Sequence, residues 1–199
     1  MSLRPLIVQS RRPRADAERN RLAILDAAQR LFAERPPDEV SMDEIALAAG
    51  VGKPTLYRRF GDRAGLVRAL LTTRETALQN RILRGPPPLG PGAPAAERMA
   101  AFMESYTDHV AENLPVLRAA EQARQGRRHD ALYESYRQHG LMLVREARPD
   151  EPDGAETEYI VDCLLGALSP ELYATQRRRG LEHEQIRGAA GSLARRLLG

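Results

Sequence analysis

Five side chains that can bind phosphates or nucleobases stand close together in one short stretch. Lys53, Arg58 and Arg59 carry positive charge, and Thr55 and Tyr57 carry hydroxyl groups. Groups of these kinds hydrogen-bond to phosphate oxygens and to the edges of bases. The chemistry that the stretch suggests is therefore binding to a nucleic acid.

Two short helices are needed to hold these side chains, and the residues around Lys53 carry the signals for both. Ser41 and Glu44 have the spacing of a capping box, in which each side chain binds a backbone N–H at a helix start. Gly50 can adopt the left-handed conformation that ends the first helix. Pro54 suits the first position of the second helix, where no N–H is needed. The apolar residues expected to face inward are Ile45, Ala46, Ala49, Val51, Leu56 and Phe60.

This succession of helix, turn and helix indicates a helix-turn-helix, whose second helix enters the major groove of DNA. The alternative is an ordinary helical hairpin with a solvated basic face. The cap, the glycine turn, the apolar residue Val51 and the basic face all fall at the spacings that a helix-turn-helix needs. Their combination favours DNA binding over the ordinary hairpin.

The chain resembles the TetR (tetracycline-repressor) family of bacterial regulators over residues 21–71. The motifs that carry the resemblance are Ile45-Ala46, Ala49-Gly50-Val51, Thr55-Leu56-Tyr57, Phe60, Arg63 and Leu66. The resemblance implies that Tyr57 binds a phosphate and that Arg63, where the family usually has a lysine, contacts the DNA backbone. Ala64-Gly65 departs from the helix-favouring, often acidic residues usual there, so a soft helix start is expected. The expected DNA-binding residues are Ser41, Lys53, Pro54, Thr55, Tyr57, Arg58, Arg59 and Arg63.

The charge of the chain is unevenly divided, although the formal net charge is only +3 at pH 7. Residues 1–84 hold 16 basic and 10 acidic side chains, whereas residues 85–199 hold 14 basic and 17 acidic ones. The basic residues 1–84 suit a domain that binds DNA, and the mildly acidic residues 85–199 suit a second domain that does not bind DNA.

Composition also disfavours several classes of protein. No apolar run is long enough to span a membrane, and residues 1–10 lack the apolar core of a secretion signal. We therefore expect an intracellular protein, and the resemblance to bacterial regulators implies the bacterial cytoplasm. Cys163 is the only cysteine, so burial as a small apolar side chain is expected rather than a disulfide or a zinc site. No metal or cofactor is expected.

The expected fold is all-α, because apolar residues recur at helical spacing and no stretch has the period of a strand. We expect a basic N-terminal arm over residues 1–15, a three-helix helix-turn-helix domain over residues 16–62 and a larger helical domain over residues 63–199. The arm contains four arginines and either lies in a minor groove or is a disordered tail. Besides the motif, helices are expected at residues 16–34, 62–81, 95–113, 128–148, 155–168 and 181–198, with breaks at 85–94 and at Pro115.

By the resemblance, the middle helices of the rear domain enclose a pocket for a small-molecule effector. The residues expected to line it are Met99, Phe102, Met103, Tyr106, Val110, Leu117 and Tyr136. Methionine and aromatic side chains make adaptable apolar walls, although plain core packing would give the same pattern. His109 flanks this stripe, and a position at the surface or behind the pocket wall is expected for it.

The last two long helices are more apolar than a helix with one wet face should be, which indicates a partner surface. Two copies paired across a two-fold axis would form a four-helix bundle. Such a homodimer would hold two recognition helices one DNA turn apart, roughly 34–36 Å. The expected interface residues are Tyr159, Cys163, Leu164, Ile186, Ala190, Leu193 and Leu197.

The expected function is therefore that of a homodimeric transcriptional regulator, most simply a ligand-responsive repressor that occupies a palindromic operator on double-stranded DNA. Two alternatives stay open: a regulator that has no small-molecule effector, and a helical enzyme. The enzyme is disfavoured because the four histidines show neither the Glu-x-x-His spacing of di-iron bundles nor the paired histidines of zinc-protease helices.

Overall fold

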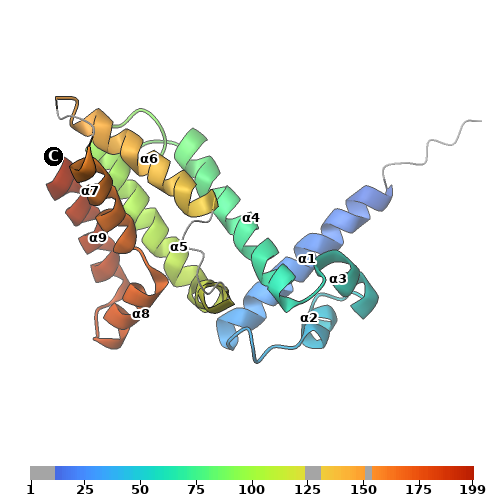
Figure 1. The fold of residues 1–199 in the computed structure, drawn as a ribbon. Coiled ribbons are helices and arrows are strands. Elements are labelled where there is room, and N and C mark those ends of the chain that lie inside the picture. The colour runs from blue at the N-terminus through green and yellow to red at the C-terminus, as the bar shows by residue number, and fades with distance from the viewer. Residues whose placement is uncertain (1–11, 124–130, 151–153) are drawn as a thin grey trace, which may run out of the picture. The chain divides into compact units, whose positions relative to one another are not determined.

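The computed structural model describes residues 12–123, 131–150 and 154–199 of the chain. These residues form nine α helices and no β strand, which confirms the expected all-α fold (Figure 1). The helices are α1 (Arg12–Glu34), α2 (Met42–Ala48), α3 (Lys53–Phe60), α4 (Arg63–Arg84), α5 (Ala95–Ala123), α6 (Ala131–Ala147), α7 (Ala155–Gly166), α8 (Pro170–Arg178) and α9 (His183–Leu198). The chain divides into two compact units between Leu70 and Leu71, so α4 contributes to both. No helix in the described ranges is both long and apolar enough to cross a membrane.

The helix-turn-helix unit, which ends at Leu70, is organised around the apolar face of α1. Ile24 and Phe32 of that helix are buried, and α2 packs against both α1 and α3 (Figure 1). Ile45 of α2 and Leu56 of α3 are likewise fully buried in this unit. The inner face of α3 therefore packs against the core of this unit, and the outer face of α3 is exposed to solvent.

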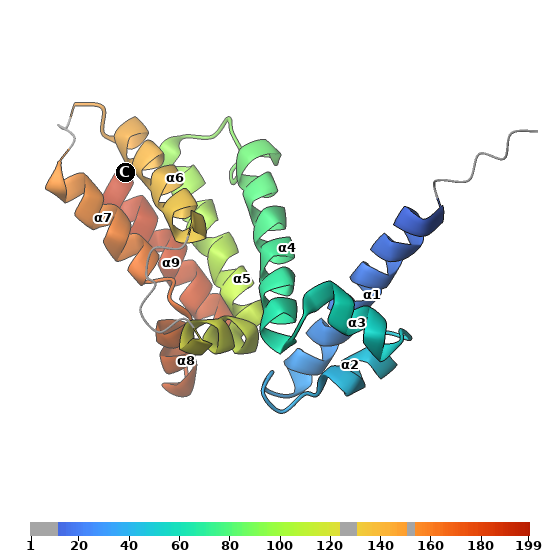
Figure 2. The same cartoon turned by 45° about the vertical axis from the view of Figure 1, so that its right-hand side comes forward.

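The C-terminal unit, which starts at Leu71, is built on α5, and this helix packs against α6, α8 and α9. Figure 2 shows α5 and α9 side by side. Gly191 of α9 lies directly against the Glu104 side chain and leaves no room for a Cβ atom. Arg187 pairs with Asp108 at 3.1 Å and Arg195 pairs with Glu104 at 3.4 Å. Close packing and ion pairs thus hold the two helices together.

The first helix starts earlier than the sequence suggested. α1 begins at Arg12 rather than at Asp16, so the end of the expected N-terminal arm is helical. Pro13 is compatible with this start because the first turn of a helix has no intrahelical use for its N–H groups. The rest of the arm, residues 1–11, lies outside the described residues, as does Arg128 at the expected start of a later helix.

The expected break at Pro115 is wrong, because α5 runs without interruption from Ala95 to Ala123. A proline inside a helix removes one hydrogen bond and crowds the preceding turn, which can bend a helix without ending it. Figure 2 shows the last turns of α5 bent away from the rest. Val110 and Val116, on either side of the proline, are buried, so packing retains both parts of the helix.

Candidate functional site

Backbone signals at both ends of α2 fix the path of the chain into α3. Ser41 Oγ accepts from the Glu44 N–H at 3.1 Å, and the Ser41 N–H donates to Glu44 Oε2 at 2.8 Å. Gly50 has a φ of 65°, and the N–H groups of Gly50 and Val51 donate to carbonyls of α2. These two bonds form a Schellman motif, a helix end that favours glycine. The predicted capping box and glycine turn are both confirmed.

An arginine from the end of α1 reinforces the capping box. Arg35 Nη2 donates to Glu44 Oε1 at 2.8 Å. The hydrogen bond from the Ser41 backbone, followed by that from Arg35, lowers the pKa of Glu44 to about 2. The carboxylate therefore stays ionised at neutral pH and joins the start of α2 to the preceding connection.

The polar face of α3 is presented to solvent on a short, well-anchored helix. The helix begins at Lys53 rather than at Pro54, because Gly52 is the N-cap and the proline takes the second position. Leu56 is fully buried beneath it, whereas the Tyr57 side chain is 47 % exposed. Of the expected DNA-binding residues, Ser41, Lys53, Pro54, Tyr57, Arg58 and Arg59 are exposed, and Thr55 and Arg63 are half-buried.

The exposed cations of this face differ in their surroundings. Lys53 Nζ pairs with Asp43 Oδ2, and Arg59 Nη2 lies 3.6 Å from Glu18 Oε2. Arg58 has no hydrogen-bond or ion-pair partner among the residues that the structure describes. A phosphate would have to share Lys53 or Arg59 with a carboxylate, so Arg58 is the side chain best prepared to bind an external group.

The residues expected to line an effector pocket form the core of the C-terminal unit. Met99, Phe102, Met103, Val110 and Tyr136 are buried, and Tyr106 and Leu117 are half-buried. The ring centroids of Phe102 and Tyr136 are 5.6 Å apart, and those of Tyr106 and Tyr136 are 5.1 Å apart. We call this group, with the two histidines described next, the aromatic core.

Two histidines belong to the aromatic core. Of the two positions expected for His109, the one at the surface is therefore wrong, and the one behind a pocket wall stays a prediction. His109 is 7 % exposed, and the Nε2 atoms of His109 and His139 and the hydroxyl of Tyr136 are buried without a hydrogen-bond partner among the described residues. Burial, reinforced by the charge of Arg74 for His109 and of Arg98 for His139, lowers both imidazole pKa values to about 4. Burial also raises the pKa of the Tyr136 hydroxyl. All three groups are therefore uncharged at neutral pH.

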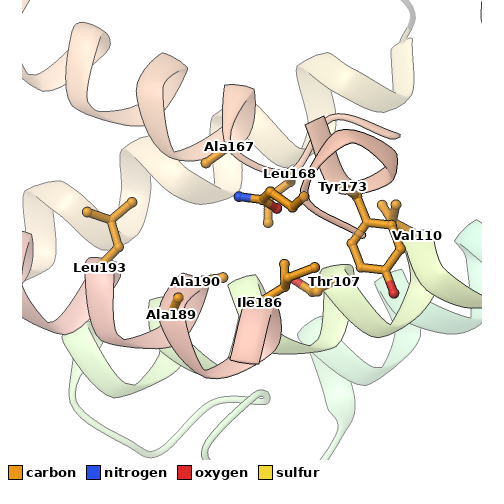
Figure 3. Close-up of a pocket in the computed structure, with 10 residues that line it drawn as sticks. Thr107, Val110, Ala167, Leu168, Tyr173, Ile186, Ala189, Ala190 and Leu193 are labelled. Carbon is orange, nitrogen blue, oxygen red and sulfur yellow. The ribbon is translucent and has the colours of Figure 1, made fainter. Parts of the chain in front are cut away.

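A cavity of about 120 Å³ lies elsewhere in the C-terminal unit, where α5, α8 and α9 meet the residues that follow α7 (Figure 3). Its lining residues are Thr107, Val110, Ala167, Leu168, Tyr173, Gln176, Ile186, Ala189, Ala190 and Leu193. Only Val110 belongs to the set that was expected to line a pocket. The sequence offered no signal for the others, because they come from four separate segments and most of them follow ordinary apolar spacing.

The residues expected at a dimer interface fall into an exposed and a buried group. Tyr159 is 71 % exposed and Leu193 40 % exposed, and Cys163 is exposed rather than buried as expected. Leu164 and Ile186 are 1 % and 6 % exposed, because they face the core of their own unit, and so offer no surface to a second chain. The remaining two, Ala190 and Leu197, are half-buried.

Comparison with known proteins assigns the helix-turn-helix unit. Residues 24–70 match the family model described as bacterial regulatory proteins, tetR family. An uncharacterized HTH-type transcriptional regulator of Mycobacterium tuberculosis is 51% identical over 63 residues, which cover 30% of this chain and 31% of that protein. The HTH-type transcriptional repressor LfrR of Mycolicibacterium smegmatis is 39% identical over 91 residues, or 46% of each chain. Residues 24–70 therefore form a helix-turn-helix unit of the tetR-family type.

TetR-family likeness in the fold extends beyond the helix-turn-helix. The crystal structure of a tetR-family transcriptional regulator from Streptomyces coelicolor aligns with a TM-score of 0.63 and 25% identity, over 91% of this chain and 89% of that one. In contrast, the sequence alignments with the two HTH-type relatives span about a third and about half of their lengths. Sequence similarity therefore concentrates in the helix-turn-helix.

Two departures from the usual TetR-family residues, both at the start of α4, have structural explanations. Arg63 Nη1 donates to the carbonyl of Asp38 at 3.0 Å and so ties α4 to the connection between α1 and α2. A Cβ atom at Gly65 would collide with the carbonyl oxygen of Phe60, and the Gly65 N–H donates to Asp62 Oδ1 at 2.7 Å. The start of α4 is therefore capped and closely packed rather than soft as expected.

Proposed function

We propose that this chain is a DNA-binding transcriptional regulator of the TetR family that represses transcription by occupying a palindromic operator. The observation that carries the proposal is the outer face of α3, where Tyr57 and Arg58 are exposed on a helix anchored by its inner face. An arginine can bind a guanine or a phosphate, and a tyrosine hydroxyl can bind a phosphate. The relative LfrR is named as a repressor, which favours repression over activation. A regulator of this kind would act in the bacterial cytoplasm, where the chromosome lies.

We propose further that the chain binds this operator as a homodimer. A single recognition helix covers too few base pairs to select one site, and a two-fold pair reads a palindrome. The support lies on α7 and α9, where Tyr159, Cys163 and Leu193 leave apolar side chains in solvent. Exposed apolar groups gathered on two helices favour a protein partner, and a second copy would bury them.

A small-molecule effector that binds the C-terminal unit would release the operator. The effector can do so only if its affinity is higher for the conformation that does not fit DNA than for the conformation that does. The support is the set of unpaired polar atoms in the aromatic core, on His109, Tyr136 and His139. Leaving such atoms unpaired costs about 1–3 kcal/mol each, so a ligand that pairs them gains affinity. Because α4 has residues in both units, a shift of this helix would transmit the change.

Selection from a random library of double-stranded DNA tests the regulator directly. We expect the purified full-length chain to enrich an inverted repeat whose half-sites are separated by whole turns of about 10–10.5 base pairs. The enriched site should bind with a Kd of roughly 10⁻⁸ M or tighter at physiological salt. Recovery of unselected sequences alone would contradict the proposal, and enrichment of a lone half-site would contradict the dimer.

The dimer can be tested by placing charge on the two exposed apolar faces. We expect Tyr159→Glu combined with Leu193→Glu to raise the dimer dissociation constant by about 100-fold, because two copies of each carboxylate would have to be desolvated at the interface. Sedimentation velocity across a range of concentrations measures this shift. Leu83→Glu is the matched control, since Leu83 is 64 % exposed on α4, outside both faces. Equal weakening by the control variant, or a wild-type chain that stays monomeric, would refute this interface.

A further inference from the structure

Three polar side chains line the cavity beside α8, those of Thr107, Tyr173 and Gln176. Thr107 Oγ1 donates its hydrogen to the carbonyl of Met103 at 2.8 Å. A hydroxyl oxygen that has donated its hydrogen still has lone pairs that accept. Gln176 Oε1 is buried and has no hydrogen-bond partner among the described residues. Both groups therefore offer hydrogen-bond acceptors to the cavity.

The third polar group, the Tyr173 hydroxyl, is connected through His183 to Asp108 of α5. His183 Nε2 lies 3.1 Å from Asp108 Oδ1, and His183 Nδ1 lies 3.1 Å from the Tyr173 hydroxyl. A carboxylate only accepts hydrogen bonds, so Nε2 carries the proton, and in the neutral imidazole Nδ1 is then the acceptor. With the imidazole in this neutral form, the Tyr173 O–H donates to His183 Nδ1, and the Tyr173 oxygen is left as an acceptor.

The other side chains that line the cavity are apolar. Val110, Leu168, Ile186 and Ala190 surround the open centre in Figure 3, and none of the described residues that line the cavity carries a carboxylate or a positive charge. Burying an ion against such a wall without a partner costs far more than burying a neutral group. The volume of about 120 Å³ is close to the roughly 150 Å³ that accommodates benzene in an engineered apolar cavity.

We propose that this cavity is a binding site for a small uncharged molecule with an apolar body and one hydroxyl group, which donates its hydrogen to Gln176 Oε1. The acceptors select a donor, the apolar wall selects the body, and the volume suits a body of about the size of one six-membered ring. The site shares Val110 with the aromatic core, but its polar groups lie on other residues, and none of its lining residues lies on α3. Its test contains no DNA, so its failure would leave the proposed regulator intact.

Phenol and toluene make a matched pair of probes, because they differ only by a hydroxyl in place of a methyl group. We expect phenol to bind the full-length chain with a Kd of roughly 1 mM, which is reasonable for so few atoms, and at least about fivefold more tightly than toluene. Benzoate should not bind. Methyl NMR spectra of the chain, recorded during each titration, should show shifts at Val110, Leu168 and Ile186. Tighter binding of toluene or benzoate than of phenol would overturn the proposal, as would shifts confined to other methyl groups.

Two variants separate recognition of the hydroxyl from the presence of the cavity. Gln176→Leu removes the acceptor and should abolish the preference for phenol over toluene while toluene still binds. Ala190→Leu fills the cavity and should abolish binding of both probes. Gly188→Leu, at an open position of the same helix, should leave both affinities unchanged. An unchanged phenol preference in Gln176→Leu, or undiminished binding in a folded Ala190→Leu chain, would overturn the proposal.

Discussion

Replacing Arg58 by alanine is expected to lower the affinity for the selected operator by about 100-fold or more. A bidentate contact to a base is worth about 1–3 kcal/mol, and a dimer loses it in both half-sites. Arg59→Ala should have a smaller effect, because Glu18 lies 3.6 Å from that guanidinium and competes for it. The expected order of effects therefore follows the intramolecular pairing of the two arginines, which have the same charge.

Titrations of a fluorescent operator, repeated at several salt concentrations, measure this prediction. If Arg58 binds a phosphate instead of a base, its loss should reduce the slope of log affinity against log salt by about one per lost contact. Arg84→Ala is the matched control, because Arg84 is an exposed arginine at the far end of α4. The assignment of α3 to the groove fails if Arg58→Ala and Arg84→Ala bind the operator equally well.

The helix-turn-helix was predictable because its signals act between neighbours in sequence. The capping box joins Ser41 to Glu44, and the Schellman motif needs only Gly50 and the last turn of α2. No distant part of the chain has to be known to place these bonds. For the same reason the exposed face of α3 could be read from spacing alone, whereas the pairing of Arg59 with Glu18 on α1 could not.

The C-terminal unit was less predictable because apolar spacing does not say what covers a helix face. Leu164 and Tyr159 lie on the same helix, α7, yet the first faces its own core and the second faces solvent. Pro115 was expected to end a helix, but packing on both sides keeps α5 continuous. His109 was expected either at the surface or behind a pocket wall, and α5 places it in the aromatic core. Each of these outcomes depends on a partner helix far away in sequence.

Acid should destabilise the C-terminal unit through its two buried histidines. The pKa of His109 and of His139 is lowered to about 4 in the folded chain, from about 6.5 in the unfolded chain. Between these values the unfolded state binds more protons, so stability is greatest above about pH 6.5 and is lost as the pH falls toward 4. At about pH 5 the expected loss is roughly 2 kcal/mol for each histidine. Glu44, whose pKa is lowered to about 2, loses its contribution only at more acid pH.

Urea unfolding at about pH 8 and about pH 5, followed by tyrosine fluorescence at one fixed protein concentration, measures this loss. Five of the six tyrosines lie in the C-terminal unit, so the signal reports mainly on that unit. His109→Gln combined with His139→Gln should lower stability at pH 8 by its change in packing but should remove most of the further loss at pH 5. The difference between wild type and variant cancels the other titrating groups, which both chains share. If the wild type and the double variant lose the same stability between the two pH values, neither histidine is buried in its neutral form as the aromatic core requires.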